Sequence, residues 1–477
     1  MTDSSGWTLD PDRAFSAIPA ERELARQIYA ASRALPIISM HGHVDAGLLL
    51  RNQPFGDPAE LLVVPDHYVV RLLVSQGATP AQLGVTRRDG GPSETDPRQI
   101  WRRFCAGWKY LRGTPSRYWL EHELAEVFGL SGPPSTATAD RLYDELSAVL
   151  AQPGYLPRAL FERFGIEILA TTDDAASPLS DHAALAQEGW GERVIPTFRP
   201  DRYTRLERPG WKAGLADLEA AADVAVDSLD GFLEALRRRR MAFAAAGARA
   251  SDHGHRSALA APLERAEAER LFAAGLAGQI NPAQAEAFAG HLLFEMARMS
   301  LEDGLVMQLH PGVLRDYDPA AHATYGPDAG FDIPLAAEFT RSLRPLLEAF
   351  GRHPGFRLIL FTVDEDTYSR ELAPLAGVFP AVRLGAPWWF LDTPGGMLRF
   401  RESVTDSAGF YNTAGFVDDT RAFASIPARH DLARRIDARH LARLVAEGYL
   451  NLDEAQETAV DLAYHLPRQA YARLDRV

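Results

Sequence analysis

The chain has 477 residues, which predicts either two or three domains or one barrel with insertions, and its formal net charge is −14. This charge excludes a general nucleic-acid binder, which needs a basic face, so the run Arg237–Arg240 is interpreted as the solvated face of a helix. The sequence has no run of 18 or more apolar residues, so no membrane span is predicted. The single cysteine, Cys105, excludes an intramolecular disulfide and fits a reducing cytoplasm.

The first third of the chain is predicted to be largely helical. Residues 1–35 are expected to form an N-terminal arm and a helix, because apolar residues recur at helical spacing after Pro19. A first strand is expected at 36–44, where an apolar run ends in polar residues. The pattern over about 45–160 is again helical, which predicts an insertion after the first strand of a catalytic domain that spans 36–477.

From residue 166 onward, short apolar runs that end in polar or charged residues alternate with helical segments. These runs predict seven further strands, at 166–173, 194–201, 248–254, 305–310, 358–364, 382–389 and 415–421. Eight strands that alternate with helices predict an α/β fold, a distorted (β/α)8 barrel of the TIM type with its reactive groups at the C-terminal strand ends. A doubly wound open sheet is the alternative, but no glycine-rich phosphate turn follows the first strand.

Two histidines at the end of the first predicted strand suggest a metal site. Side chains two residues apart in a strand point the same way, so His41 and His43 are expected to converge. The last strand of a closed barrel lies beside the first, which brings Asp419 to the same place. Two imidazoles and a carboxylate form a three-ligand site with an open position. The alternatives are that the histidines are solvated loop residues and that Asp418 or Asp419 only caps the next helix.

Two further patterns narrow the chemistry at this barrel mouth. Arg199, Arg315 and Arg421 lie at or just beyond predicted strand ends, which favours an anionic substrate because guanidinium groups pair with carboxylates. Neither Lys109 nor Lys212, the only lysines, lies near the fourth predicted strand. A two-metal site bridged by a carboxylated lysine at that strand is therefore excluded.

The order and spacing of several short motifs resemble the uronate (glucuronate) isomerase family of the amidohydrolase superfamily. The matching stretches are Pro36–Val44, Asp66–Tyr68, Gly113–Pro115, Trp119-Leu120, Phe128-Gly129, Thr171–Asp174, Phe198–Asp201, Ser251–Gly254, Met307–His310 with Arg315, Leu384-Gly385, Trp388–Phe390, Asp419–Arg421 and Arg429-His430. Each motif alone is weak, but together they cover almost the whole chain.

The resemblance implies an aldose–ketose isomerase that interconverts D-glucuronate with D-fructuronate and D-galacturonate with D-tagaturonate. It implies one divalent metal held by His41, His43 and Asp419; zinc is expected, with manganese, iron, nickel and cobalt left open. It assigns proton transfer between C2 and C1 to Tyr68, Asp419 and Arg421, with Arg421 lowering the pKa of the Tyr68 phenol. The implied substrate-binding residues are His67, Arg199, Asp252, His310, Arg315 and Trp388.

Some expectations stay open at this point. A hydride shift is the mechanistic alternative, and a mononuclear metal-dependent hydrolase or decarboxylase is the alternative function. The expected partner is a small sugar acid, with no nucleic acid or membrane, and a homo-oligomer is compatible with the resemblance. The sequence departs from the family pattern at Ser39, Val69, Val70, Asp418 and Thr420, which leaves the preferred uronate undecided.

Overall fold

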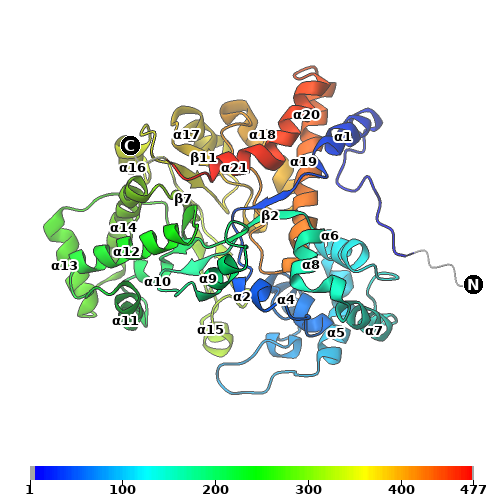
Figure 1. The fold of residues 1–477 in the computed structure, drawn as a ribbon, viewed down its shortest axis with the longest axis horizontal. Helices are drawn as coiled ribbons and strands as arrows, with labels where there is room; N and C mark the ends of the chain where they lie inside the picture. The colour runs from blue at the N-terminus through cyan, green and yellow to red at the C-terminus, as the bar shows by residue number, and fades with distance from the viewer. Residues whose placement is uncertain (1–5, 475–477) are drawn as a thin grey trace, which may run out of the picture.

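The wall of the barrel is formed by parallel strands near the centre of the molecule (Figure 1), and their hydrogen bonds divide the sheet into two parts. The computed structural model describes residues 6–474; residues 1–5 of the predicted arm and residues 475–477 of the predicted catalytic domain lie outside the described residues. The strands of the wall are β1 (Ile37–Ser39), β2 (Ile166–Ala170), β3 (Asp173–Asp174), β4 (Val194–Ile195), β5 (Phe198–Arg199), β6 (Ala250–His253), β7 (Val306–Leu309), β10 (Leu358–Leu360) and β11 (Val382–Leu384).

The strand order follows the chain around the barrel. One part of the sheet has the order β1-β2-β4 and the other the order β11-β10-β7-β6-β5-β3. Because β2 leads directly into β3 and β4 into β5, the two parts form one wall. Pro196 lies between β4 and β5 and cannot donate a backbone hydrogen bond, which fits the break there. Several predicted strands are therefore shorter or split, while the predicted barrel is confirmed.

The prediction of an eighth strand at 415–421 is wrong. Within the described residues, 415–421 forms no regular strand, and an isolated bridge joins Leu384 to Thr413. Gly415 and Asp419 have left-handed backbone angles, with φ of +75° and +44°, which an extended strand does not tolerate. The segment still closes the barrel, because Asp419 N donates to His41 O over 3.1 Å and His43 N donates to Thr420 O over 2.9 Å.

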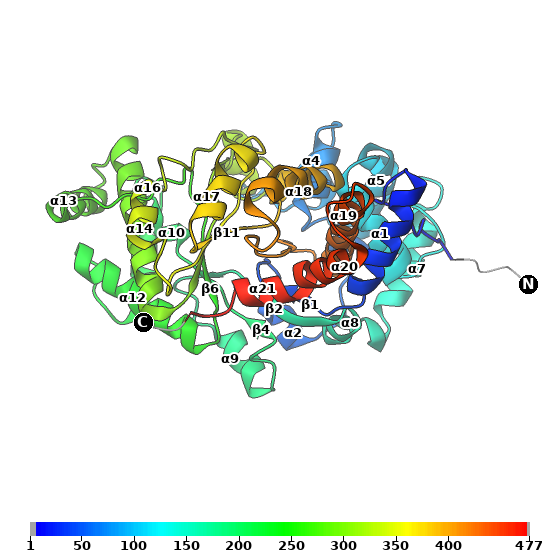
Figure 2. The same cartoon turned by 90° about the horizontal axis from the view of Figure 1, so that it is seen from above.

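Helices surround this wall, and those between β1 and β2 gather on one side of it (Figures 1 and 2). Up to β2, the helices are α1 (Pro19–Ser32), α2 (Ala46–Arg51), α3 (Pro58–Leu62), α4 (His67–Val74), η1 (Pro80–Leu83), α5 (Pro97–Gly107), η2 (Trp108–Leu111), α6 (Pro115–His122), η3 (Glu123–Val127), α7 (Ala139–Leu150), η4 (Pro153–Tyr155) and α8 (Pro157–Arg163). Helix α1 packs against two helices near the C-terminus, α19 (Ile426–Ala446) and α20 (Leu452–Val460).

The later helices follow the strands in turn. They are α9 (Ser180–Gln187), α10 (Asp201–Thr204), α11 (Trp211–Ala222), α12 (Leu229–Ala245), α13 (Arg265–Leu276), α14 (Pro282–Asp303), α15 (Pro319–Tyr325), α16 (Arg344–Phe350), η5 (Tyr368–Leu372), α17 (Ala373–Val378), η6 (Trp389–Leu391), α18 (Pro394–Ala408), η7 (Phe423–Ser425), α19 (Ile426–Ala446), α20 (Leu452–Val460), η8 (Asp461–His465) and α21 (Leu466–Ala470). A short antiparallel pair, β8 (Val313–Leu314) and β9 (Ile333–Pro334), follows β7. None of the described helices is long and apolar enough to cross a membrane.

The strand residues alternate between a hydrophobic core inside the barrel and hydrophobic clusters outside it. Ile38, Ile168, Ile195, Val306 and Ile359 come from different strands and share one buried cluster, which fills the inside of the barrel. Their neighbours along the strands belong to other clusters that pack against the surrounding helices. Because the strands are parallel, the residues that follow them lie at one end of the barrel, its mouth.

The run Arg237–Arg240 on α12 differs from its interpretation as a solvated face. Arg240 is fully buried, and its Nη2 donates to Asp303 Oδ1 over 3.0 Å. Arg239 donates to backbone carbonyls, while Arg237 and Arg238 pair with glutamates at the surface. The run therefore connects α12 to neighbouring segments through hydrogen bonds and ion pairs. Four consecutive arginines in the sequence do not indicate that one of them is buried and paired.

The close approach of Gly385 to Phe361 links barrel packing to the mouth. A Cβ on Gly385 would lie 2.3 Å from the Phe361 ring, and that ring stacks on His310 at 4.0 Å between centroids. We expect Gly385→Ala to lower the free energy of unfolding by about 1–3 kcal/mol through overpacking. Urea unfolding measures the change, with Gly154→Ala as the control because a Cβ there meets no atom within 4 Å. Equal stability of the two variants would contradict this packing.

Candidate metal centre and active site

His41 and His43 lie just after β1 and not within it. The strand ends at Ser39, and the chain bends at His41, so strand alternation does not explain how the two side chains converge. Hydrogen bonds hold this loop instead: Thr172 Oγ1 donates to Gly42 O over 2.8 Å, in addition to the backbone bonds to the 419–420 segment. A Cβ on Gly42 would lie 3.3 Å from Asp418 Oδ1, so the loop packs tightly on its partner.

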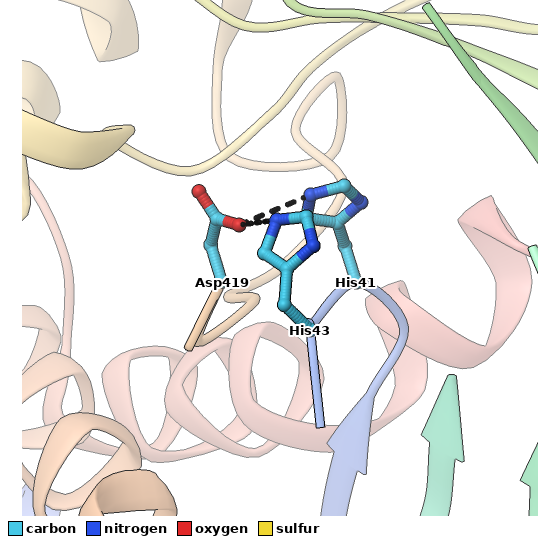
Figure 3. A group of neighbouring side chains, drawn as sticks. All are labelled: His41, His43 and Asp419. Carbon is cyan, nitrogen blue, oxygen red and sulfur yellow. Dashed lines mark ion pairs between the residues drawn. The ribbon is translucent and has the colours of Figure 1, made fainter. Parts of the chain in front are cut away.

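Asp419 faces both histidines from the other end of the chain (Figure 3). Its Oδ1 lies 3.2 Å from His41 Nε2 and 2.8 Å from His43 Nε2. Its left-handed φ of +44° is uncommon for a residue with a side chain and often marks a functional site. Burial raises the pKa of the Asp419 carboxyl, but the facing imidazoles outweigh burial and hold the pKa well below its usual range.

The donor atoms of His41, His43 and Asp419 fit a metal ion. One atom from each lies within 4.8 Å of the others, and Asp419 Oδ1 is buried without a hydrogen-bond partner. The side chain of His41 is 2% exposed and that of His43 is 24% exposed, so one side of the group faces the cavity. Two imidazoles and one carboxylate with an open side are typical of a catalytic metal site.

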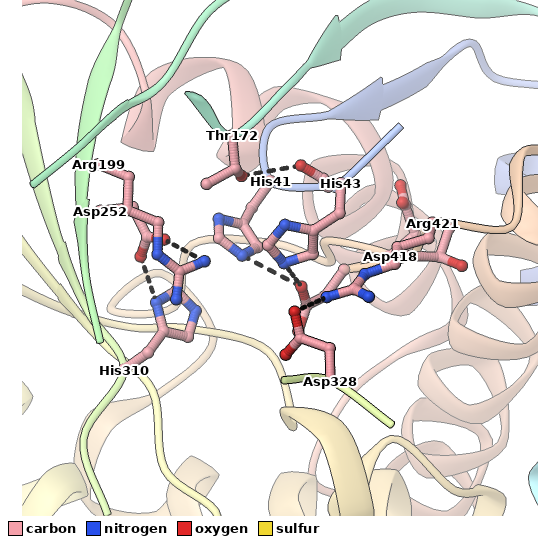
Figure 4. A network of polar contacts seen from close by, with 12 residues as sticks. His41, His43, Thr172, Arg199, Asp252, His310, Asp328, Asp418 and Arg421 are labelled. Carbon is pink, nitrogen blue, oxygen red and sulfur yellow. Dashed lines mark hydrogen bonds and ion pairs between the residues drawn. The ribbon is translucent and has the colours of Figure 1, made fainter. Parts of the chain in front are cut away.

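A second group, made of His41, Asp252 and His310, also meets the distance criterion for a metal ion. His310 Nδ1 and Asp252 Oδ1 are 2.6 Å apart, and Arg199 Nη1 lies 3.5 Å from Asp252 Oδ2 (Figure 4). Asp252 is thus already paired with an imidazole and a guanidinium. A cation placed there would face the positive charge of Arg199, so the first group is the better metal site.

The residues proposed from sequence for the metal, the substrate and proton transfer all line one cavity that opens to solvent. Its lining includes His41, His43, His67, Tyr68, Arg199, Asp252, His310, Arg315, Trp388, Asp419 and Arg421. Asp66 caps α4 by accepting hydrogen bonds from Tyr68 N and Val69 N, and this cap places His67 and Tyr68 in the first turn. The insertion therefore supplies one wall of the cavity.

Each arginine at the mouth has an aspartate partner. Arg199 Nε donates to Asp201 Oδ2 over 2.7 Å, Arg315 Nη1 to Asp332 Oδ2 over 3.0 Å, and Arg421 Nη2 to Asp328 Oδ2 over 2.8 Å. Asp328 and Asp332 were not anticipated, since they lie in an irregular loop before β9 with no periodic pattern. These pairs orient the guanidinium groups around the cavity.

The expected pairing of Arg421 with Tyr68 is not present. The cation beside Tyr68 is Arg429, whose guanidinium carbon lies 5.3 Å from the ring centroid, whereas Arg421 pairs with Asp328. Burial raises the pKa of the Tyr68 phenol well above its usual value, Asp392 raises it further, and Arg429 opposes both. Arg429 belongs to one of the family motifs, whereas no pattern in the sequence indicates Asp392.

The other aromatic and imidazole groups form the floor and sides of the cavity. His67 stacks on Tyr68 at 4.7 Å between centroids, and burial, with Arg421 nearby, lowers the pKa of His67 to about 3. His310 packs between His41, at 4.6 Å, and Trp388, at 4.8 Å. The cavity therefore combines charged groups with flat surfaces on which a sugar ring can rest.

The family model of glucuronate isomerase matches residues 16–471. The chain belongs to the glucuronate isomerase family. It is 52% identical to a uronate isomerase of Xanthomonas campestris pv. campestris (strain B100), over 97% of this chain and 98% of that one. It is 50% identical to a uronate isomerase of Brucella canis, over 97% of this chain and 99% of that one.

Solved structures of this family share the fold. The crystal structure of glucuronate isomerase from Caulobacter crescentus matches with a TM-score of 0.95 and 48% identity over 97% of both chains. The uronate isomerase from Thermotoga maritima matches with a TM-score of 0.91 and 26% identity, over 98% of this chain and all of that one. The resemblance inferred from the motifs is confirmed.

Of the positions that depart from the family pattern, Thr420 lines the cavity, and the others lie behind its surface. Ser39 is buried and its hydroxyl has no hydrogen-bond partner, while Val69 and Val70 pack in the core of the insertion. Asp418 Oδ2 lies 3.1 Å from His430 Nε2, and the hydroxyls of Thr420 and Ser425 are 3.1 Å apart. Asp418 and Thr420 flank Asp419 and thus contribute to the segment that presents it.

Single histidine variants distinguish the two groups that could hold a metal. We expect His43→Ala to weaken metal binding more than about 10-fold, because it removes one of three ligands, and His310→Ala to retain it. Metal content after dialysis against a weak chelator, measured by plasma mass spectrometry, checks both. Loss of metal from His310→Ala but not from His43→Ala would place the ion at the second group instead.

Proposed function

We propose that the protein interconverts aldo- and keto-hexuronates, namely D-glucuronate with D-fructuronate and D-galacturonate with D-tagaturonate. The observation that carries the proposal is that one cavity brings together a candidate metal group, carboxylate-binding arginines and Tyr68. Membership of the family agrees with this, since the curated relatives are uronate isomerases. The reaction removes the proton at C2, passes through an enediol and returns a proton to C1.

The charge of the cavity suits a sugar acid together with a divalent ion. Within the described residues, four arginines and five aspartates line it. A divalent cation would convert this formal excess of one negative charge into one positive charge, which matches the single carboxylate of a hexuronate. Zinc suits the donor set of two imidazoles and a carboxylate, and when bound it would polarise the substrate oxygens.

The residues of the chain have separate tasks in this proposal. Arg199 and Arg315 bind the carboxylate or hydroxyls, with Asp252, His310, His67 and Trp388 completing the pocket. Tyr68 moves the C2 proton, and Arg421 with Asp328 shapes the side of the cavity beside it. Asp419 holds the metal and exchanges protons with sugar hydroxyls.

The domain organisation of the chain, its partners and its cellular location are proposals as well. We infer an N-terminal arm and helix over 1–35 that supports one catalytic domain over 36–477, with its insertion at about 45–160. The partner is a small sugar acid, with no nucleic acid or membrane, and self-association of the chain is compatible with the fold. A cytoplasmic location is still the prediction from the single, buried Cys105.

Conversion in deuterated water tests the reaction class. We expect the metal-loaded protein to form a ketose from glucuronate or galacturonate, with deuterium from solvent at C1, because a proton carried by Tyr68 exchanges with water. Proton NMR of the product measures the incorporation. Absence of any conversion of both sugars by protein that holds stoichiometric metal would contradict the proposed function, and a hydrolysis product from a carboxylated amide would favour the hydrolase alternative.

Loss of one mouth arginine should weaken substrate binding. We expect Arg315→Gln to lower kcat/KM by about 10–100-fold, mostly through KM, since a charge-assisted hydrogen bond contributes about 1.5–3 kcal/mol. Steady-state kinetics measure this, with Arg344→Gln as the control because Arg344 is exposed on α16 and pairs only with Glu348. A KM for Arg315→Gln equal to that of the control would remove Arg315 from the binding site.

A further inference from the structure

Asp392 lies directly behind Tyr68 and outside the cavity lining. It follows η6, is 5% exposed, and its Oδ2 accepts hydrogen bonds from Tyr68 Oη over 3.4 Å and from Arg429 Nη1 over 2.9 Å. Its Oδ1 is buried with no hydrogen-bond partner. One carboxylate oxygen is therefore shared by a phenol and a guanidinium, which a simple structural ion pair does not require.

Arg429 is held rigidly in place beside this pair. It projects from α19, is 2% exposed, and its guanidinium carbon lies 3.6 Å from the centroid of a Trp119 ring. It also donates to Asp418 O over 3.3 Å and to Ser425 Oγ over 3.2 Å. A fixed buried cation of this kind balances one negative charge and not two.

These contacts place one positive charge beside two acidic groups that together carry one negative charge. That charge resides on Asp392 when Tyr68 is protonated, and on Tyr68 when the proton has moved to the carboxylate. The net charge of the buried group is the same in both states. Phenolate can then form without moving a charge out to water, a step that burial would make costly.

Resting on the proposed isomerase function, we propose that Asp392 and Arg429 are positioning residues that enable Tyr68 to act as the base. The Tyr68 O–H bond breaks and its proton passes to Asp392 Oδ2, which leaves a phenolate and a neutral carboxyl beside Arg429. The phenolate then takes the C2 proton, the C2–H electron pair forms the C1–C2 double bond, and the carbonyl electron pair moves to O1. The Tyr68 hydroxyl returns this proton to C1 while the O2 hydroxyl proton passes to O1, which leaves the ketone at C2 and a phenolate. The proton on Asp392 finally returns to Tyr68, so protons and electrons balance.

The electrostatics of the pocket support this role. Burial raises the pKa of Asp392 to about 7, against the lowering effect of Arg429, so its carboxyl can accept a proton near neutral pH. A carboxyl of ordinary acidity would be a far poorer acceptor from a phenol. The other charged and titratable groups that influence Tyr68 or Asp392 are Asp66, Asp419, Arg71 and Tyr368.

The pH profile of Asp392→Asn tests the proposal. Wild-type kcat should rise with pH and level off above about 7, where Asp392 is ionised and free to accept the proton. In Asp392→Asn, kcat at neutral pH should fall on the order of 10²-fold with little change in KM, and should keep rising with pH because Tyr68 must now lose its proton to solvent. A plateau at the wild-type position with Asn present would overturn the proposal.

Three control variants separate this role from a loss of packing. Asp437→Asn removes a carboxylate on the same helix as Arg429, in a buried pair with Arg401 at 2.6 Å, and should leave kcat and its pH profile unchanged. In a Tyr68→Phe background, adding Asp392→Asn should change kcat less than about twofold, because Asp392 acts through Tyr68. An equal loss in both backgrounds contradicts the proposal. Asp392→Glu keeps a carboxyl and should keep the plateau even if the Asn variant does not fold; a Glu variant without a plateau also contradicts it.

Failure of the proposed function is recognised separately. If wild-type protein with bound metal converts neither glucuronate nor galacturonate, the function fails, and the Tyr68–Asp392 pair is then tested by absorbance. The tyrosinate signal of Tyr68, identified as the difference from Tyr68→Phe, should appear at lower pH in Asp392→Asn, because the Arg429 charge is no longer balanced. If it appears at the same or a higher pH, the inference fails as well.

Discussion

The backbone hydrogen bonds between His41-Gly42-His43 and the segment 418–420 are the contact on which the site depends. They close the barrel where a regular eighth strand does not form. The same bonds hold the loop that carries two histidines against the turn that carries Asp419. Because Asp419 adopts a left-handed backbone angle, its carboxylate faces the two imidazoles instead of following the direction of the chain. The same contacts therefore close the barrel and bring together the three residues of the candidate metal site.

The second constraint is the balance of charge in a largely buried mouth. Arginine and aspartate side chains occur there in pairs, and each pair keeps a guanidinium in a defined direction at low cost in desolvation. The pairs differ in burial: Arg421 and Asp328 are partly exposed, whereas Arg429 and Asp392 are almost fully buried. In the proposed function, the exposed pairs face the substrate carboxylate. The buried pair can only redistribute its charge, and in our account it does so through Tyr68.

Much of this arrangement could be predicted from the sequence because it follows from strand order. His41, His43 and Asp419 belong together once the first and last segments of a closed barrel are neighbours, and Arg199 and His310 follow strands that end at the same mouth. The motifs also identified the family correctly. Contacts that depend on side chains from irregular segments could not be predicted. Asp328 and Asp332 lie in a loop without periodicity, Asp392 follows a short helical turn, and the partner of Tyr68 is set by the packing of α19.

A crystal structure of the metal-loaded protein with a bound hexuronate, with anomalous data collected at the absorption edge of the metal, would locate the ion and the substrate. We expect one anomalous peak, next to Nε2 of His41, Nε2 of His43 and the carboxylate of Asp419, with the sugar carboxylate at the mouth arginines. A peak between His41, Asp252 and His310, or a sugar bound in the cavity of an active protein with no metal at Asp419, would contradict this expectation.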